Sequence, residues 1–359
     1  MVHPEFWNSK RVFVTGHTGF KGAWLCLWLS RMGAKVTGYA LPPPTNPSLF
    51  EMARVDELID SHIGDVRDLA ALEAAMRAAQ PEIVIHMAAQ SLVRYSYQNP
   101  VETFSTNVLG TVHALDAVRR TPAVRAVVIV TSDKCYYNEE WVWAYREDSR
   151  LGGVDPYSGS KGAAELVVTA YRHSYFSADR HATGPAVASA RAGNVIGGGD
   201  WALDRLVPDI LRSLLKNEPT VIRNPQATRP WQHVLEPLSG YLTLAEHLYH
   251  HGHRYSSGWN FGPSEQSERT VGWIIEKLYA MWGVGFEWKR DEDPGPPEST
   301  FLKLDASKAR ALLRWQPKLD LTSALHWIVD WTRNYQQGAD MREVTFSEIE
   351  RFAAIVPAQ

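Results

Sequence analysis

The feature that most constrains the fold is the stretch Val14-Thr15-Gly16-His17-Thr18-Gly19-Phe20-Lys21-Gly22. The apolar run 12–14 before it predicts a strand, and the apolar pattern of 23–29 after it predicts a helix. Glycines between a strand and a helix allow a tight turn whose free N–H groups face an anion at the positive helix end. The sequence therefore predicts a strand–turn–helix unit that binds the pyrophosphate of a dinucleotide, with residues 16–22 as candidate ligands.

Strand and helix patterns alternate beyond this turn. Helices are predicted at 69–79 and 100–120, and further strands at 35–40, 58–63, 82–88 and 126–130. Such alternation indicates an α/β fold with a doubly wound parallel Rossmann sheet. After about residue 190 the pattern loosens, which indicates a smaller C-terminal α/β lobe that binds substrate. The predicted NAD-binding domain comprises 1–189 and about 226–258, and the predicted nucleotide-sugar-binding lobe comprises 190–225 and 259–359.

Residues after the predicted strands are further candidates for the cofactor site, because open parallel sheets bind ligands at the carboxyl ends of their strands. Asp65 could accept a hydrogen bond from an adenine amino group, although a turn role is an equal alternative. Tyr39 and Ala40 stand where such folds usually carry an acidic residue, so this strand does not separate NAD from NADP. The candidates beyond the turn are Asp65, Val66, Ala88, Ala89 and Gln90, together with Asn107 in the middle of the helix predicted at 100–120.

Two motifs carry candidate catalytic groups. Thr131-Ser132-Asp133-Lys134 directly follows the fifth predicted strand, and Tyr157 precedes Lys161 by four residues. Residues four apart lie on one face of a helix, so the Lys161 ammonium should lower the pKa of the Tyr157 phenol and make it a base. Ser132 could share the proton of a substrate hydroxyl with Tyr157.

Together these residues resemble the extended short-chain dehydrogenase/reductase family over nearly the whole chain. Thr15-Gly16-x-x-Gly19-Phe20-x-Gly22 is similar to its cofactor turn, and Tyr157 with Lys161 to its catalytic pair. Within this family the chain resembles the nucleotide-sugar 4,6-dehydratases, most closely those acting on CDP-D-glucose. The segments behind the narrower resemblance are 16–22, 38–41, 131–136, 138–148, 191–201 and 229–234.

The resemblance implies an NAD-dependent dehydration of a nucleotide sugar. Tyr157 would take the proton of the 4-hydroxyl while the C4 hydride passes to NAD, water would leave across C5 and C6, and the hydride would return to C6. Asp133 would protonate the leaving 6-hydroxyl. Lys134 stands where related dTDP-glucose enzymes carry Glu, and it could be the C5 base, if its pKa is depressed, or could stabilise the enolate.

Arginine suits the diphosphate of such a substrate, because its guanidinium makes bidentate hydrogen bonds to phosphate. A surface ion pair is the alternative for Arg205 and Arg223, and core packing is the alternative for Trp201. The substrate-binding candidates are Arg94, Ser132, Arg191, Asn194, Trp201, Arg205, Arg223 and Arg229.

Family resemblance also implies a homodimer or a dimer of dimers, formed through the helices at 100–120 and 156–176. The apolar positions on these helices are consistent with this assembly, although core-facing helices would show the same pattern. They are Val101, Phe104, Val108 and Val112 on the first helix, and Ala163, Leu166, Val167 and Ala170 on the second.

Composition and charge argue against nucleic-acid binding, membrane association and metal binding. A net charge of -3 gives no basic excess for nucleic acid or an anionic membrane surface. No apolar run is long enough to span a bilayer, and the first residues do not resemble a signal peptide. Cys26 and Cys135 lack metal-type spacing, so we expect no metal and a cytoplasmic location.

Three alternatives to a CDP-glucose dehydratase stay open. A dehydratase for dTDP-glucose or GDP-mannose is one. A nucleotide-sugar 4-epimerase would need Tyr157 and Lys161 but no acid/base pair at 133 and 134. A non-catalytic cofactor sensor on the same fold would typically lack Tyr157 or Lys161, and this chain has both.

Overall fold

The computed structural model describes residues 2–178, 184–285, 288–291 and 301–356. Its centre is a parallel sheet with the strand order β11-β6-β5-β4-β1-β2-β3. The strands are β1 (Arg11–Thr15), β2 (Lys35–Ala40), β3 (Asp60–Ile63), β4 (Ile83–His86), β5 (Ala126–Val130), β6 (Ala186–Arg191) and β11 (Gly258–Asn260). The chain reverses its direction of travel across the sheet between β1 and β4, and a ligand crevice is expected at such a switch point. The predicted doubly wound α/β fold is confirmed.

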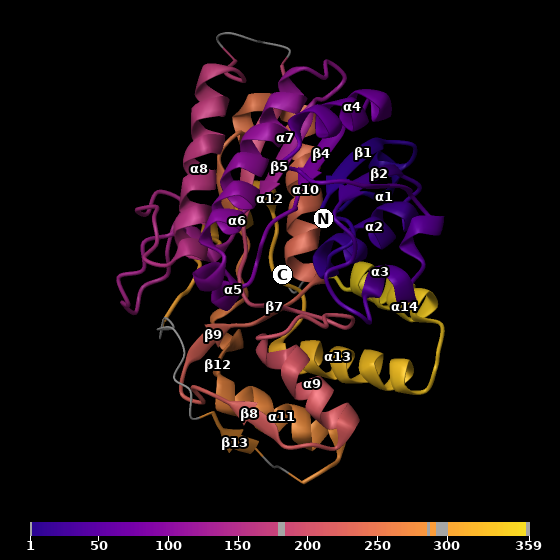
Figure 1. Ribbon diagram of the computed structural model, residues 1–359, viewed down its shortest axis with the longest axis vertical. Helices are drawn as coiled ribbons and strands as arrows, with labels where there is room; N and C mark the ends of the chain where they lie inside the picture. The colour runs from indigo at the N-terminus through magenta and orange to yellow at the C-terminus, as the bar shows by residue number, and fades with distance from the viewer. Residues whose placement is uncertain (1, 179–183, 286–287, 292–300, 357–359) are drawn as a thin grey trace.

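Helices cover both faces of this sheet (Figure 1). One face packs against α4 (Leu69–Ala79), α7 (Gly110–Arg119) and α8 (Pro156–Ser174), and the other against α2 (Phe20–Arg31) and α10 (Leu235–His251). Along β1, Val12 and Val14 join the core beneath α2 and α10, whereas Phe13 joins the core beneath α4 and α7. This period of two is what a strand buried on both faces requires.

The helix predicted at 100–120 is interrupted. It consists of α6 (Pro100–Phe104), a π-helical turn (Ser105–Leu109) and α7, preceded by the short α5 (Val93–Gln98). The prediction for 69–79 matches α4, and Asp68 accepts a hydrogen bond from the N–H of Ala71 at its start. The remaining short helices near the N-terminus are α1 (Pro4–Trp7) and α3 (Leu49–Met52). No helix in the described part of the chain has the length and apolar character to cross a bilayer.

A smaller lobe lies below the sheet in Figure 1. Its helices are α9 (Leu206–Lys216), α11 (Val271–Trp282) and α13 (Leu321–Gln336). Short strand pairs complete it: β7 (Val195–Ile196) with β10 (Gln232–His233), β8 (Thr220–Ile222) with β13 (Trp288–Arg290), and β9 (Thr228–Pro230) with β12 (Glu268–Thr270).

The domain boundary differs from the predicted one at the C-terminal side. The second segment of the expected lobe began at residue 259, but β11 is the edge strand of the large sheet, paired with β6. Two later helices also pack with the large domain: α12 (Ser307–Leu313) against α10 and β11, and α14 (Met341–Ala354) against α2 and α3. The lobe is therefore an insertion whose chain returns to the large domain more than once.

Candidate active site

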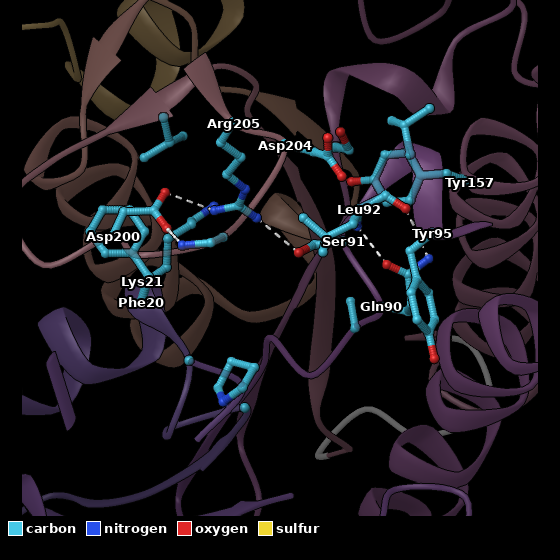
Figure 2. Close-up of a pocket in the computed structure, with 18 of the residues that line it drawn as sticks. Phe20, Lys21, Gln90, Ser91, Leu92, Tyr95, Tyr157, Asp200, Asp204 and Arg205 are labelled. Carbon is cyan, nitrogen blue, oxygen red and sulfur yellow. Dashed lines mark hydrogen bonds and ion pairs between the residues drawn. The ribbon is translucent and has the colours of Figure 1, made fainter. Parts of the chain in front are cut away.

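A cleft of about 1170 Å³ opens between the carboxyl ends of the central strands and the smaller lobe (Figure 2). It brings together most of the predicted site residues from both parts of the molecule. The predicted residues that line it are Gly16, Thr18, Gly19, Phe20, Lys21, Gly22, Asp65, Val66, Ala88, Ala89, Gln90, Arg94, Ser132, Asp133, Lys134, Tyr157, Lys161, Asn194, Trp201, Arg205, Arg223 and Arg229. Three predicted residues, His17, Asn107 and Arg191, do not line it.

The glycine turn is shaped by close backbone contacts. Gly16 has a φ of +79°, and a Cβ there would lie 2.8 Å from the Ala88 nitrogen. At Gly22 a Cβ would lie 2.0 Å from the Gly16 carbonyl oxygen, so the start of α2 can pack on the turn only without a side chain. Gly19 is the N-cap residue of α2 and lines the cleft. The positive end of α2 thus faces the cleft, which fits a dinucleotide pyrophosphate.

The prediction that His17 binds the cofactor is corrected by its position. The imidazole is fully buried and lies beneath β2, where a Cβ on Gly38 would be 2.4 Å from it. Its Nε2 lies 2.7 Å from the Ser61 hydroxyl on β3. Because the side chain points into the sheet rather than the cleft, we assign it a packing role.

Lys21 takes the opposite orientation and lines the cleft. Its Nζ donates to the Tyr241 hydroxyl at 3.0 Å and lies 5.1 Å from the centre of that ring. Burial, together with the charges of Lys161 and Arg205, lowers the pKa of Lys21 to about 7, while Asp133 opposes this shift. The ammonium is therefore part of the cleft's charge and titrates near neutral pH.

Asn107 acts on the cleft indirectly. It lies in the π-helical turn and is buried; its Oδ1 accepts from the Gln90 N–H at 2.8 Å and its Nδ2 donates to the Gln90 carbonyl at 2.9 Å. The same Nδ2 lies 2.9 Å from the Ser160 hydroxyl on α8. Asn107 therefore holds the loop after β4 against the helix of Tyr157, which corrects its assignment as a cofactor contact.

Asp133 is a buried carboxyl group at the carboxyl end of β5. Its Oδ1 accepts from the Ser132 hydroxyl and the Lys134 N–H, both at 2.9 Å. Its Oδ2 accepts a hydrogen bond from Asn194 Nδ2 at 3.4 Å. The same oxygen packs against Gly193 so closely that a Cβ there would be only 1.8 Å from it. Asp133 is thus held in one orientation at the wall of the cleft, as an acid aimed at one bond requires.

Tyr157 and Lys161 lie in the first turns of α8, which begins at the Asp155 N-cap and Pro156. Both are buried, and Lys161 Nζ is 6.0 Å from the centre of the Tyr157 ring. Burial raises the pKa of Tyr157 to about 12, against a hydrogen bond with Ser132 that lowers it. The expected lowering by Lys161 is therefore wrong for the protein alone. Burial also lowers the pKa of Lys161 to about 8.

Cations gather where the cleft meets the smaller lobe. Asp204 Oδ1 lies 2.7 Å from Arg223 Nη2 and 3.8 Å from Arg94 Nη1, while Arg205 donates to Asp200 and to the Ser91 hydroxyl (Figure 2). Nε and Nη2 of Arg94 are buried with no hydrogen-bond partner in the described part of the chain. These donors give the cleft groups for an anionic substrate at its lobe side.

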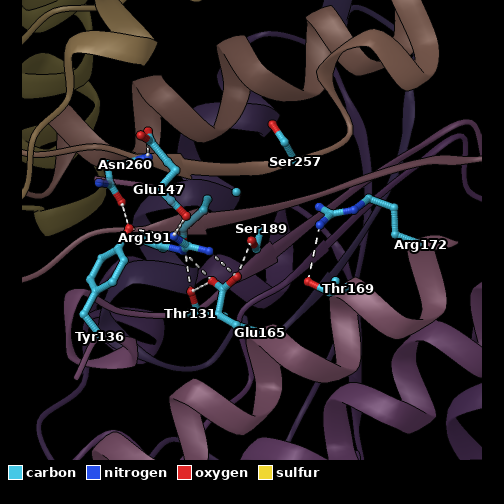
Figure 3. A network of polar contacts seen from close by, with 12 residues as sticks. Thr131, Tyr136, Glu147, Glu165, Thr169, Arg172, Ser189, Arg191, Ser257 and Asn260 are labelled. Carbon is cyan, nitrogen blue, oxygen red and sulfur yellow. Dashed lines mark hydrogen bonds and ion pairs between the residues drawn. The ribbon is translucent and has the colours of Figure 1, made fainter. Parts of the chain in front are cut away.

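Arg191 lies in the core, which corrects its prediction as a substrate ligand. Its guanidinium forms a buried ion pair with Glu165 of α8, with Nη2 at 2.7 Å from Oε2 (Figure 3). Sequence reasoning missed Glu165, although an acidic residue four places after Lys161 on a core-facing helix was a visible signal.

The geometry defines a class of protein: a dinucleotide-binding domain whose cleft joins a Tyr-x-x-x-Lys pair to a buried acid and an arginine-rich lobe. Comparison with known proteins gives the family. The sequence model of the family described as GDP-mannose 4,6 dehydratase matches residues 13–327, and the chain belongs to that family.

Curated relatives extend over nearly the whole chain. A CDP-glucose 4,6-dehydratase of Salmonella typhimurium is 54% identical over 353 residues, covering 98% of this chain and 98% of that protein. A dTDP-glucose 4,6-dehydratase of Xanthomonas campestris is 28% identical, covering 89% of this chain and 92% of that protein.

Solved structures show the same fold at low sequence identity. The dTDP-glucose 4,6-dehydratase of Bacillus anthracis in complex with NAD has a TM-score of 0.74 at 20% identity and covers 93% of this chain and 100% of its own. The UDP-glucose 4-epimerase of Thermotoga maritima with UDP-glucose has a TM-score of 0.76 at 21% identity. The match covers 90% of this chain and 99% of the epimerase chain.

Proposed function

We propose that the protein converts CDP-D-glucose to CDP-4-dehydro-6-deoxy-D-glucose, with NAD as a cofactor that is regenerated in each turnover. The observation that carries the proposal is the 54% identity to a CDP-glucose 4,6-dehydratase over 98% of both chains. The glycine turn, Tyr157, Lys161 and Asp133 lie on one cleft, which fits the dinucleotide and the two kinds of proton transfer that the reaction needs.

The first half of the reaction is oxidation at C4 of the sugar. When bound, NAD supplies a hydride acceptor at C4 and a hydride donor at C6. Tyr157 accepts the proton of the 4-hydroxyl, with the Ser132 hydroxyl beside it as a hydrogen-bond partner. The pKa of about 12 disfavours phenolate in the protein alone, so Tyr157 works as a base only once positive charge is close to its oxygen. Among the chain's own groups, the charge of Arg205 already lowers this pKa, and Lys161, buried on the same helix, is a second cation near the ring.

The second half is loss of water across C5 and C6. The 4-ketone makes the C5 proton acidic, and Asp133 donates a proton to the departing 6-hydroxyl. Lys134 lines the cleft next to Asp133 and has two candidate roles, C5 base or stabiliser of the enolate. Lys134→Arg separates them, because arginine keeps the cation but does not lose its proton. An arginine variant that still eliminates water would exclude the base role.

The substrate assignment can be tested with four nucleotide sugars. CDP-glucose, dTDP-glucose, UDP-glucose and GDP-mannose are each incubated with enzyme and NAD, and the products are read by their absorbance in alkali, which 4-keto-6-deoxy sugars show. We expect efficient product only from CDP-glucose. An epimerised hexose, which lacks this absorbance, would overturn the dehydratase assignment.

We also propose that the protein forms a homodimer through α6, α7 and α8, or a dimer of such dimers. Apolar side chains on the outer faces of these helices support this: Val101 is 82% exposed, Leu166 60% and Phe104 42%. Exposed apolar side chains that gather on one face are typical of protein contacts. Light scattering at micromolar concentration should give twice or four times the mass of one chain, and a monomer would refute the proposal.

A further inference from the structure

Glu165 is a buried carboxylate outside the cleft that contacts the end of β5, through Thr131, and β6, through Ser189 and Arg191 (Figure 3). It lies on α8 four residues after Lys161, and only 1% of it is exposed. Its Oε1 accepts from the Thr131 hydroxyl at 2.6 Å and Arg191 Nε at 2.9 Å, and its Oε2 from the Ser189 hydroxyl and Arg191 Nη2, both at 2.7 Å. Both oxygens are therefore fully used.

Two of these donors begin the segments that hold Asp133. Thr131 immediately precedes Ser132 and Asp133, so the Thr131 bond fixes the backbone that carries the acid. Arg191 ends β6, and the two residues that touch the other side of Asp133, Gly193 and Asn194, follow it after Ala192. Glu165 thus holds Asp133 from both sides, from the same helix that carries Tyr157 and Lys161.

The ion pair continues into the segment after Asp133. Arg191 Nη1 donates to the Tyr136 hydroxyl at 2.6 Å, and that hydroxyl donates to Asn260 Oδ1 at 2.7 Å. Burial alone would raise the pKa of Glu165, but the charge and hydrogen bonds of Arg191 outweigh it and keep the pKa below its usual value. A buried ion pair is costly to desolvate, so its use here points to fixed geometry rather than to extra stability.

We propose that Glu165 is a positioning residue for dehydration: through Thr131 and Arg191 it sets the place of Asp133 relative to Tyr157 and Lys161. The inference rests on the proposed function. Oxidation at C4 uses Tyr157, Lys161 and Ser132, whereas water loss also needs Asp133 at the 6-hydroxyl while the same sugar stays at Tyr157. Since a shift of about 1 Å can cost about 10²-fold in rate, loosening this link should slow elimination more than oxidation.

The sharpest test uses Thr131, because its variants change one hydroxyl and little else. Thr131→Val removes the donor at nearly constant volume, and Thr131→Ser keeps it. In single turnovers with CDP-glucose, formation of NADH reports oxidation and formation of the 4-keto-6-deoxy product reports elimination and hydride return. We expect Thr131→Val to slow product formation about 10-fold, with NADH formation and KM within about twofold of wild type. Thr131→Ser should restore the product rate.

Glu165→Gln should act in the same direction and more strongly, about 30- to 100-fold on product formation. His173→Gln is the matched control, because His173 lies on α8 but is exposed there, apart from the contacts of Glu165. It should leave both rates unchanged. Circular dichroism establishes that each variant is folded; if Glu165→Gln is not, the Thr131 pair decides.

Two outcomes overturn the inference. A folded Thr131→Val that forms product at the wild-type rate, or that loses oxidation and elimination by the same factor, shows that the network only supports the fold. The proposed function fails separately, because in that case wild-type enzyme makes no 4-keto-6-deoxy product from CDP-glucose.

Discussion

The two walls of the cleft are built in different ways. On the sheet wall, Ser132, Asp133, Tyr157 and Lys161 are each at most 8% exposed and stand at a strand end or in a helix. On the lobe wall, Trp201, Arg205, Arg223 and Arg229 are half-buried, and most lie in loops or short strands. From this contrast we expect the regular elements to place the reacting groups, and the side chains on the loops of the lobe to contribute most to the choice of nucleotide sugar.

The largest effect should come from the sheet wall at Tyr157. Tyr157→Phe removes one hydroxyl from a packed site, so the fold should persist while turnover falls by about 10² to 10⁴, the usual contribution of a positioned base. Steady-state kinetics with CDP-glucose measures the loss. A mutant of near-normal activity would rule out Tyr157 as the base. It would also leave the sheet wall without its main catalytic group, so the two walls could no longer be assigned different functions.

Asp133→Asn should divide the sheet wall into two functions. The amide keeps the shape of the carboxyl group but cannot donate a proton to the 6-hydroxyl, so product formation should fall about 10²-fold or more. Oxidation at C4 does not use Asp133, so enzyme-bound NADH should still form on addition of CDP-glucose. Equal loss of both steps in a folded variant would mean that Asp133 is not a dedicated elimination acid.

The residues of the sheet wall could be predicted from the sequence because each belongs to a short motif on one strand end or one helix. A strand followed by Thr-Ser-Asp, and Tyr and Lys four apart on a helix, place their side chains by the geometry of the element alone. Arg191 could not be placed in this way. It lies three residues before Asn194, which reaches the cleft, but its direction is decided by Glu165, 26 residues earlier on another element.

A similar limit applies to the glycine turn and the domain boundary. His17 and Lys21 both occupy variable positions of the turn, and only the contacts of His17 with β2 and β3 send it into the sheet. In the second half of the chain, β11 returns to the large sheet by pairing with β6, which lies at least 67 residues earlier in the sequence. The three residues of β11 are too few for their pattern to predict this partner.

Where the large domain meets the lobe, Arg94→Gln should affect binding more than chemistry. Arg94 faces Asp204 of the lobe and has two buried donor atoms without a partner in the described part of the chain. Charge-assisted hydrogen bonds contribute about 1.5–3 kcal/mol, so KM for CDP-glucose should rise about 10- to 100-fold with a smaller change in kcat. Arg119→Gln, on the far surface of α7, is the control. A change in kcat alone would place Arg94 with the sheet wall.

The smallest effect should come from the glycine turn, where the affinity for NADH depends on pH through Lys21. With its pKa near 7, Lys21 is cationic at pH 6 and mostly neutral at pH 8.5. The cation attracts the pyrophosphate, so binding should be about 3- to 10-fold tighter at the lower pH, and Lys21→Met should remove most of this difference.

His17→Gly should change the affinity less than about twofold while lowering stability, because His17 fills space beneath Gly38. Calorimetric titration at both pH values measures each variant. A strong loss of affinity in His17→Gly would show that His17 binds the cofactor. A pH dependence that persists in Lys21→Met would show that Lys21 does not cause it.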